Sequence, residues 1–198
     1  MLQQLKQKKE SLSEQYRESE VGQPGLAVRQ IRRDDIAVIE EIERNSFEFA
    51  WTIREFQQVL GTPSCDGAVA VLNGRIVAYI IIERGRGYVD ILNLAVVEEF
   101  RRIGVGTALI EKTIETITPF AHSIDLTVRE RNVEAQQFFR SQGFRATAIL
   151  RNFYDNMPED AYIMERKLDQ TQFDRIPYSS GRNTIQITLH PTSREDKE

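Results

Sequence analysis

The 198-residue sequence has little of what several classes of protein require. It contains one cysteine, Cys65, which excludes a disulfide framework within the chain and is typical of a reducing compartment. The formal net charge of -4 provides no basic surface for a nucleic acid, and no apolar run is long enough to span a membrane. The first residues lack the apolar block of a signal peptide. We therefore expect a cytoplasmic protein without nucleic-acid or membrane partners.

Polar segments flank an ordinary globular composition. Apolar residues make up 40% of the chain and charged residues 28%, values that are typical of a folded domain. Residues 1–25 are rich in Gln, Lys, Glu and Ser, and residues 169–198 are also polar, with one strand-like run at 184–189. We predict a polar N-terminal arm over 1–25, a folded domain over 26–168 and a polar C-terminal tail over 169–198.

Hydrophobic spacing between the arms predicts alternating strands and helices. The predicted strands are 26–31, 68–72, 75–83, 88–97, 123–128, 144–150 and 161–168. The predicted helices are 34–44, 52–60, 107–117 and 132–142. Asp34 is the predicted N-cap of the first helix, Thr52 and Glu55 form a capping box, and Asn73-Gly74 predicts a hairpin turn. The order β-α-α-β-β-β-α-β-α-β-β predicts an α/β fold with a mixed sheet and helices on its faces.

The most informative short segment is the glycine-rich turn Phe100-Arg101-Arg102-Ile103-Gly104-Val105-Gly106. It joins the apolar run 91–97 to the helical stretch 107–117. This order aims several backbone N–H groups and the positive end of a helix at one point, which is suited to phosphate. The glycines let an anion approach the backbone and permit a positive φ. An ordinary strand-to-helix turn is the alternative interpretation.

Four blocks in order resemble the GNAT N-acetyltransferase superfamily, and within it the RimI-like enzymes that acetylate N-terminal α-amines. The blocks are 91–96 with 101–106, then 126–132, then 135–144, and finally 151–154 with 159–161 and Met164. The resemblance covers roughly residues 26–168. It implies the GNAT fold, in which a central, mostly antiparallel sheet splays at the acetyl-CoA site and carries helices on both faces.

The resemblance also implies acetyl-CoA as cosubstrate, without a metal. The amides of residues 102–107 would hold the diphosphate, and the pantetheine arm would pair with exposed strand backbone. The implied binding residues are Leu94, Ala95, Val96, Arg101, Arg102, Ile103, Gly104, Val105, Gly106, Thr107 and Asn132. Asn132 has a second interpretation as a helix N-cap, and Arg101 either meets a phosphate or pairs with a surface carboxylate.

The catalytic residues of the family are not all present. RimI-like enzymes typically have a glutamate base where this chain has Thr127 and a tyrosine acid where it has Phe139. Asp90 is the predicted substitute base, acting through water, and Tyr154 in the closing loop is predicted to orient the amine or donate a proton. The alternative for Asp90 is a solvated carboxylate at the end of a strand, and the alternative for Tyr154 is a ring that serves packing. Glu83 and solvent are further candidates for proton transfer.

Trp51 and Tyr154 are the predicted lining of a peptide groove. Phe47 and Phe56 lie in the same region of the sequence, where core packing explains most aromatic residues. By resemblance, the groove would hold the first residues of the acceptor, and the backbone N–H of Val96 would stabilise the oxyanion.

The predicted activity is transfer of an acetyl group from acetyl-CoA to a protein N-terminal α-amine, with a ribosomal protein as the acceptor that the resemblance suggests. An α-amine has a reference pKa near ~8, against ~10.4 for lysine, so modest base assistance suffices. One alternative is a GNAT enzyme that acts on lysine or a small-molecule amine. Another is a catalytically weak acyl-CoA-binding sensor or interaction module, which Thr127 and Phe139 favour. A monomer or weak homodimer is expected.

Overall fold

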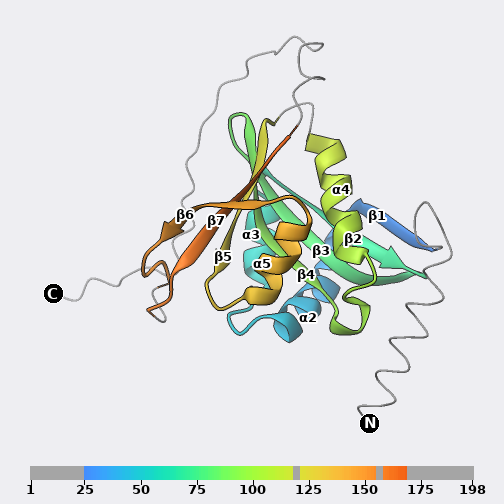
Figure 1. The fold of residues 1–198 in the computed structure, drawn as a ribbon. Helices are drawn as coiled ribbons and strands as arrows, with labels where there is room; N and C mark the ends of the chain where they lie inside the picture. Colours follow the sequence, from blue (N-terminus) through green and yellow to red (C-terminus); the bar gives the residue numbers. More distant parts are fainter. Residues whose placement is uncertain (1–24, 118–120, 155–157, 169–198) are drawn as a thin grey trace, which may run out of the picture.

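The computed structural model describes residues 25–117, 121–154 and 158–168, and seven strands within them form one sheet (Figure 1). The strands are β1 (Leu26–Gln30), β2 (Cys65–Leu72), β3 (Arg75–Arg84), β4 (Tyr88–Val96), β5 (Ser123–Arg129), β6 (Arg145–Leu150) and β7 (Ala161–Lys167). The α-helices are α2 (Ile36–Ser46), α3 (Ile53–Leu60), α4 (Val105–Ile117) and α5 (Val133–Ser141), with 3-10 turns at Arg33–Asp35 and Glu98–Phe100. The predicted order of strands and helices is confirmed.

The sheet is mixed and mostly antiparallel. Its order is β1-β2-β3-β4-β5-β7-β6, and every neighbouring pair is antiparallel except β4 and β5. This topology confirms the predicted fold class. β2 begins at Cys65 rather than at residue 68, because Cys65 and Asp66 already pair with Glu83 and Ile82. The Cys65 thiol is half-buried there, and burial raises its pKa, so its environment is that of a structural side chain.

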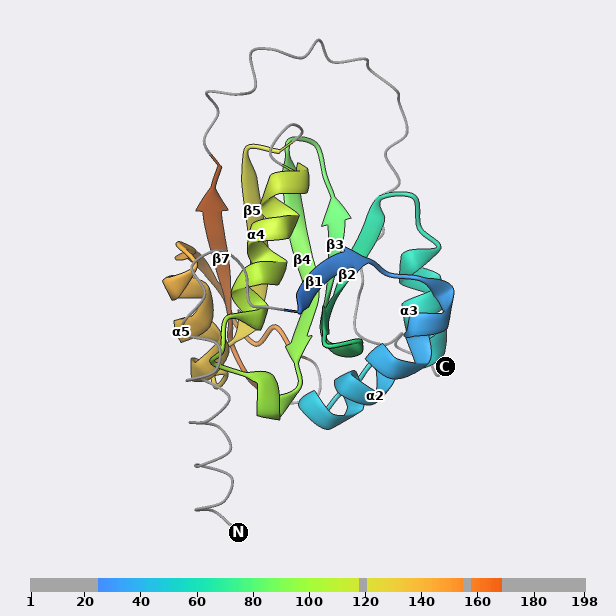
Figure 2. The ribbon, with the colours of Figure 1, turned by 90° about the vertical axis from the view of Figure 1, so that its right-hand side faces the viewer.

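Two hydrophobic clusters pack on opposite faces of the sheet, and Figure 2 shows the helices on its two sides. Helices α4 and α5 cover one face and contribute Leu109 and Phe139. Helices α2 and α3 cover the other face and contribute Ile39 and Phe56. From Ala78 to Ile82, successive residues of β3 alternate between the two clusters, because successive side chains of a strand point to opposite faces. The predicted helices on both faces are therefore confirmed.

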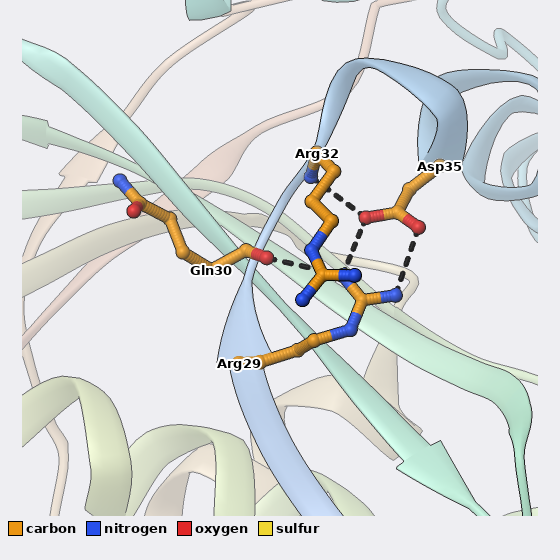
Figure 3. Close-up of polar contacts among 4 residues, drawn as sticks. All are labelled: Arg29, Gln30, Arg32 and Asp35. Carbon is orange, nitrogen blue, oxygen red and sulfur yellow. Dashed lines mark hydrogen bonds and ion pairs between the residues drawn. The ribbon is translucent and has the colours of Figure 1, made fainter.

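A partly buried ion pair joins β1 to the start of α2 (Figure 3). The Arg29 guanidinium donates to both carboxylate oxygens of Asp35, at 2.6 and 2.9 Å, and the Arg32 backbone N–H donates to the same group at 2.7 Å. These donors lower the pKa of the Asp35 carboxyl. The prediction of Asp34 as N-cap is wrong. Asp34 is exposed inside the 3-10 turn Arg33–Asp35, and its neighbour Asp35 receives the donors instead.

The sheet opens between β4 and β5, as predicted. Their pairing joins only residues 88–91 to residues 123–126. Beyond this point β4 stays on β3, with Leu94 opposite Ile80 and Val96 opposite Ala78, while β5 continues along β7. A bulge at Leu92 interrupts the register of β4 on β3, and such a bulge increases the local twist. In the described part of the chain, one backbone edge of β4 therefore has no strand partner after Ile91.

The predicted arms lie outside the described residues apart from Gly25, and so does the strand-like run at 184–189. The division into two polar arms and a folded domain therefore stays a prediction. Among the helices that the structure describes, none is long and apolar enough to cross a membrane.

Candidate active site

A cleft of about 530 Å³ opens where β4 parts from β5, bounded by the turn before α4 and by α5. The end of α2 also reaches it, through Ser46 and Phe47. The predicted cofactor residues that line the cleft are Leu94, Ala95, Val96, Arg101, Arg102, Gly104, Gly106, Thr107 and Asn132. The other two predicted cofactor residues do not line the cleft with their side chains. Val105 is buried and Ile103 packs against the core, so only their backbone groups are available to a ligand.

The turn before α4 presents a set of unused backbone donors. Arg102 and Gly104 both have positive φ, 66° and 92°, which turns the chain sharply into the helix that begins at Val105. Among the described residues, no carbonyl accepts a hydrogen bond from the amides of residues 102–107. The first amide to bond back is that of Ala108, which donates to the Gly104 carbonyl at 3.0 Å. Free amides at a helix N-terminus are suited to bind an anion.

Gly104 and Gly106 are required for different reasons. Gly104 has the positive φ that was predicted, but Gly106 does not. A side chain at Gly106 would place its Cβ 3.0 Å from the ring of Phe138 on α5, so the absence of a side chain allows α4 and α5 to approach. Gly106 therefore does not use the positive φ that glycine permits, and its missing side chain allows close helix packing instead.

The open edge of β4 presents its backbone to the cleft. Val97 N–H donates to the Val77 carbonyl on β3 at 2.9 Å. Because N–H groups alternate in direction along a strand, the N–H and C=O groups of Val96 and Leu94 face away from β3, toward the cleft. Arg101 Nε donates to the Val96 carbonyl at 3.0 Å, and its guanidinium lies 3.8 Å from Glu134. Of the two interpretations of Arg101, this placement matches a carboxylate partner and support of the strand.

Asn132 lies at the cleft and also caps α5. Its side-chain oxygen accepts from the Ala135 backbone N–H at 3.0 Å, so the N-cap interpretation is confirmed. The same residue lines the cleft, and its amide nitrogen stays available to a ligand because the oxygen makes the cap.

A row of acidic residues crosses the sheet where β4 and β5 are still paired. Asp90 lies opposite Glu83 on β3 and Asp125 on β5, and Asp125 lies opposite Glu165 on β7. Burial, together with Asp125 and Glu83, raises the pKa of Asp90 to about 6. The Oδ1 atom of Asp125 is buried without a hydrogen-bond partner among the described residues. Asp90 is thus a carboxyl group whose proton affinity lies close to neutral pH, as a general base requires.

The positions that depart from the family pattern supply no acid or base. Thr127 is exposed on β5, two residues after Asp125 and therefore on the same face. Phe139 is buried on α5 and packs edge-on against Phe144, with ring centroids 5.3 Å apart. Neither side chain can accept a proton from an amine.

Tyr154 lies in a cluster that joins three segments. The Arg129 guanidinium stacks 3.6 Å from the centre of the Tyr154 ring and lies 5.3 Å from the Phe49 ring. Arg129 also donates to Glu159 at 2.9 Å, and the Arg131 backbone N–H donates to the other oxygen of that carboxylate. Burial raises the pKa of the Tyr154 hydroxyl, so it stays protonated near neutral pH. The contact of Arg129 with this ring was not predicted from the sequence.

The aromatic residues of the α2–α3 region have three different environments. Phe56 is fully buried, and the core-packing interpretation holds for it. Trp51 is half-buried and packs edge-on against Phe56, with centroids 5.4 Å apart. Phe47 lines the cleft, whereas Trp51 does not. The predicted contact of Trp51 with a peptide therefore stays a prediction.

Glu43 is a buried residue that contacts β4 and was not predicted from the sequence. It lies on α2, is 1% exposed, and accepts hydrogen bonds from the Trp51 backbone N–H at 2.9 Å and from Asn93 Nδ2 at 3.0 Å, both at Oε1. The Tyr79 hydroxyl donates to Oε2. A signal was present, because Glu43 is four residues after Ile39 and falls within the buried stripe of its helix.

Comparison with known proteins agrees with this geometry. The sequence profile of the Acetyltransferase (GNAT) family matches residues 36–144. An uncharacterised N-acetyltransferase of Methanocaldococcus jannaschii is 34% identical over 149 residues, covering 72% of this chain and 92% of the relative. A putative ribosomal protein bS18-alanine N-acetyltransferase of Bacillus subtilis is 31% identical over 140 residues, covering 70% and 93%. The crystal structure of the ribosomal-protein-S18-alanine N-acetyltransferase from Escherichia coli has a TM-score of 0.68 at 24% identity, covering 77% of this chain and 99% of that chain, and shows the same fold.

Proposed function

Because the chain belongs to the acetyltransferase (GNAT) family, we propose that it transfers the acetyl group of acetyl-CoA to the α-amine at a protein N-terminus. The name of the Bacillus subtilis relative, which refers to an alanine of a ribosomal protein, supports this acceptor. The observation that carries the proposal is the cleft itself, in which the free amides of residues 102–107 and the open edge of β4 face the same space.

The proposed donor complex uses backbone groups. The diphosphate of acetyl-CoA lies against the amides of residues 102–107, where the dipole of α4 adds attraction. The pantetheine arm, which carries two amides, pairs with Leu94 and Val96 as a short added strand. Asn132 offers its side-chain nitrogen to the same arm. No metal is needed, because the amides meet the charge of the phosphates.

The proposed reaction is direct attack of the neutral amine on the thioester carbon. The new N–C bond forms while the carbonyl oxygen becomes an oxyanion, which the Val96 N–H stabilises. Collapse of the intermediate breaks the C–S bond and releases the coenzyme A thiolate. The nitrogen loses its proton through water to Asp90, and the thiolate gains one from Tyr154 or from solvent.

A comparison of two peptides tests the proposed acceptor. One peptide has a free N-terminal alanine and no lysine, and its partner has a formylated N-terminus and one internal lysine. With labelled acetyl-CoA, we expect acetylation of the first peptide alone. Preference for the second peptide, or for a small amine such as a polyamine, would replace the α-amine with another acceptor. Tight acetyl-CoA binding without turnover on any amine would identify a binding module instead.

A cytoplasmic location and a monomeric or weakly dimeric state are part of the same proposal. Sedimentation velocity at several concentrations measures the second directly, and a tight dimer at low concentration would contradict it.

A further inference from the structure

The hydrogen bond between Glu43 and Asn93 fixes the direction of the Asn93 carboxamide. Glu43 Oε1 accepts from the amide nitrogen Nδ2 of Asn93 at 3.0 Å, which turns the carbonyl oxygen Oδ1 of Asn93 away from Glu43. Within the described residues, this Oδ1 accepts no hydrogen bond, and it does not belong to the buried polar atoms that lack a partner. Asn93 therefore presents a solvent-accessible acceptor in a fixed direction.

The fixed acceptor lies on the face of the sheet that carries α2, and its neighbour in sequence lines the cleft. Asn93 is opposite Ile81 and Asp90 is opposite Glu83, so both project from the face that carries α2. Ile81 and Glu83 are two residues apart, which places Asn93 and Asp90 about 7 Å from each other along the strand. The next residue after Asn93 is Leu94, whose backbone faces the cleft.

We propose that Asn93 Oδ1 accepts a hydrogen bond from the incoming α-amine and that Glu43 is the positioning residue that holds Asn93 in this orientation. The inference rests on the proposed function and names the group that orients its acceptor. A neutral primary amine has two N–H groups and one lone pair. When Oδ1 accepts one N–H, the lone pair turns toward the thioester carbon, and the second N–H stays free for the water that leads to Asp90.

The contacts of Glu43 explain why a carboxylate is present at this buried position. Its Oε1 atom receives both Trp51 N–H and Asn93 Nδ2, which links the α2–α3 loop to β4. The Tyr79 hydroxyl satisfies the other oxygen. A glutamine keeps one oxygen for the first two donors and offers its amide nitrogen to Tyr79, whereas an apolar residue leaves all three donors without a partner.

Three variants test the inference in the full-length protein. Asn93→Ala removes the acceptor and should lower kcat/KM for the α-amine peptide about ten-fold, the value of one hydrogen bond of ordinary strength. Glu43→Met should have a similar effect because Asn93 is then free to turn, and Glu43→Gln should stay within about three-fold of wild type. The dissociation constant of acetyl-CoA, measured by calorimetry, should change less than about two-fold in all three.

A double-mutant cycle separates positioning from a general structural role. If Glu43 acts through Asn93, then Glu43→Met combined with Asn93→Ala should be no slower than Asn93→Ala alone. If the losses of kcat/KM in the two single variants multiply in the double variant, the positioning role of Glu43 is overturned. If Asn93→Ala leaves the peptide kinetics unchanged, the whole inference is overturned. If Glu43→Met does not fold, the Asn93→Ala and Glu43→Gln variants still decide the amine contact.

The wild-type protein distinguishes failure of this inference from failure of the proposed function. The wild-type rate on the α-amine peptide tests the function, and the ratio of variant to wild type tests Asn93. Should the wild type prefer a lysine or a small amine, the same cycle is measured on that amine. A ratio near one on the preferred amine would then contradict the inference.

Discussion

Asp90 is the proposed base of the reaction, although its position in sequence does not mark it as a base. Its neighbours on both sides of β4 are carboxylates, and burial together with these neighbours raises its pKa to about 6. A carboxyl group in this range is largely ionised at pH 7 and still accepts a proton readily. Asp90 could therefore take the role of the base that Thr127 cannot fill, while the role of the acid missing at Phe139 falls to Tyr154 or solvent.

Replacing Asp90 with asparagine should slow turnover and change the pH profile. We expect kcat to fall about 30-fold or more, with little change in acetyl-CoA affinity. In wild type, log kcat/KM should rise with a slope of about 2 below pH 6, where Asp90 and the amine both titrate, and with a slope of about 1 up to pH 8. The variant should show the slope of 1 throughout, and a variant profile identical to that of wild type would remove Asp90 as the base.

The same substitution should raise the free energy of unfolding by an amount that depends on pH. The folded-state pKa of Asp90 is raised, so its stabilising contribution is present below the unfolded pKa and is lost as pH rises through about 6. Asp90→Asn should therefore be more stable than wild type at pH 8, by about 1 to 2 kcal/mol after allowance for solvent screening, with a smaller difference at pH 4. Urea unfolding at the two pH values measures this. A gain that is larger at pH 4 would contradict the assignment.

Tyr154 offers two separable contributions, its ring and its hydroxyl. Tyr154→Phe keeps the stacking on Arg129 and should lower kcat about five-fold through loss of the hydroxyl. Tyr154→Ala also removes the ring and should raise the peptide KM, while acetyl-CoA binding stays unchanged. Initial rates at varied peptide concentration distinguish the two effects. An unaltered rate in the phenylalanine variant would restrict Tyr154 to packing.

At the scale of elements, the junction of β4 with α4 shapes the cleft. The strand leaves β5 after Ile91, and the turn with positive φ at Arg102 and Gly104 then directs the amides of residues 102–107 into the space that opens. The sequence analysis could predict this junction, because a strand, paired glycines and a helix follow one another. It could not predict that Gly106 serves the packing of α4 against Phe138, since that contact joins two helices distant in sequence.

Two glycines with similar backbone conformations allow a controlled test of the junction. Gly104 and Gly74 have positive φ, 92° and 82°, but Gly74 lies in the β2–β3 hairpin with nothing within 4 Å of an added Cβ. Alanine at either position should cost about 1 kcal/mol of stability through backbone strain. Only Gly104→Ala should also weaken acetyl-CoA binding, by about ten-fold or more, because it displaces the amides. Equal affinities in calorimetry would remove the role of this turn in phosphate binding.

At the scale of the whole molecule, α2 must be held in place for Glu43 to reach β4. The ion pair of Arg29 with Asp35 fixes the start of α2 to β1 (Figure 3), and the apolar face of the helix packs on the sheet. The element order and the two helical layers could be predicted from hydrophobic periodicity. The contact of Asp35 could not be predicted, because Asp34 and Asp35 are equally good helix starters. The folded positions of Arg29 and of the Arg32 amide select Asp35.

Loss of this ion pair should destabilise the entire fold. Asp35→Asn should lower the free energy of unfolding by about 1 to 3 kcal/mol, whereas Asp34→Asn, at the exposed neighbouring position, should change it by less than about 0.5 kcal/mol. Because the folded-state pKa of Asp35 is lowered, the contribution is present above the unfolded pKa and is lost as pH falls through the folded one. The difference between the variants should therefore shrink in acid. Equal stabilities at pH 7 would show that this junction is not needed.

A crystal structure of the protein with acetyl-CoA tests the central claim most directly. We expect the diphosphate oxygens to lie about 2.7 to 3.2 Å from amides of residues 102–107, with the pantetheine amides paired to Leu94 and Val96 and the thioester next to Asn93. A cosubstrate that is bound elsewhere, or whose diphosphate is held only by side chains, would contradict the account.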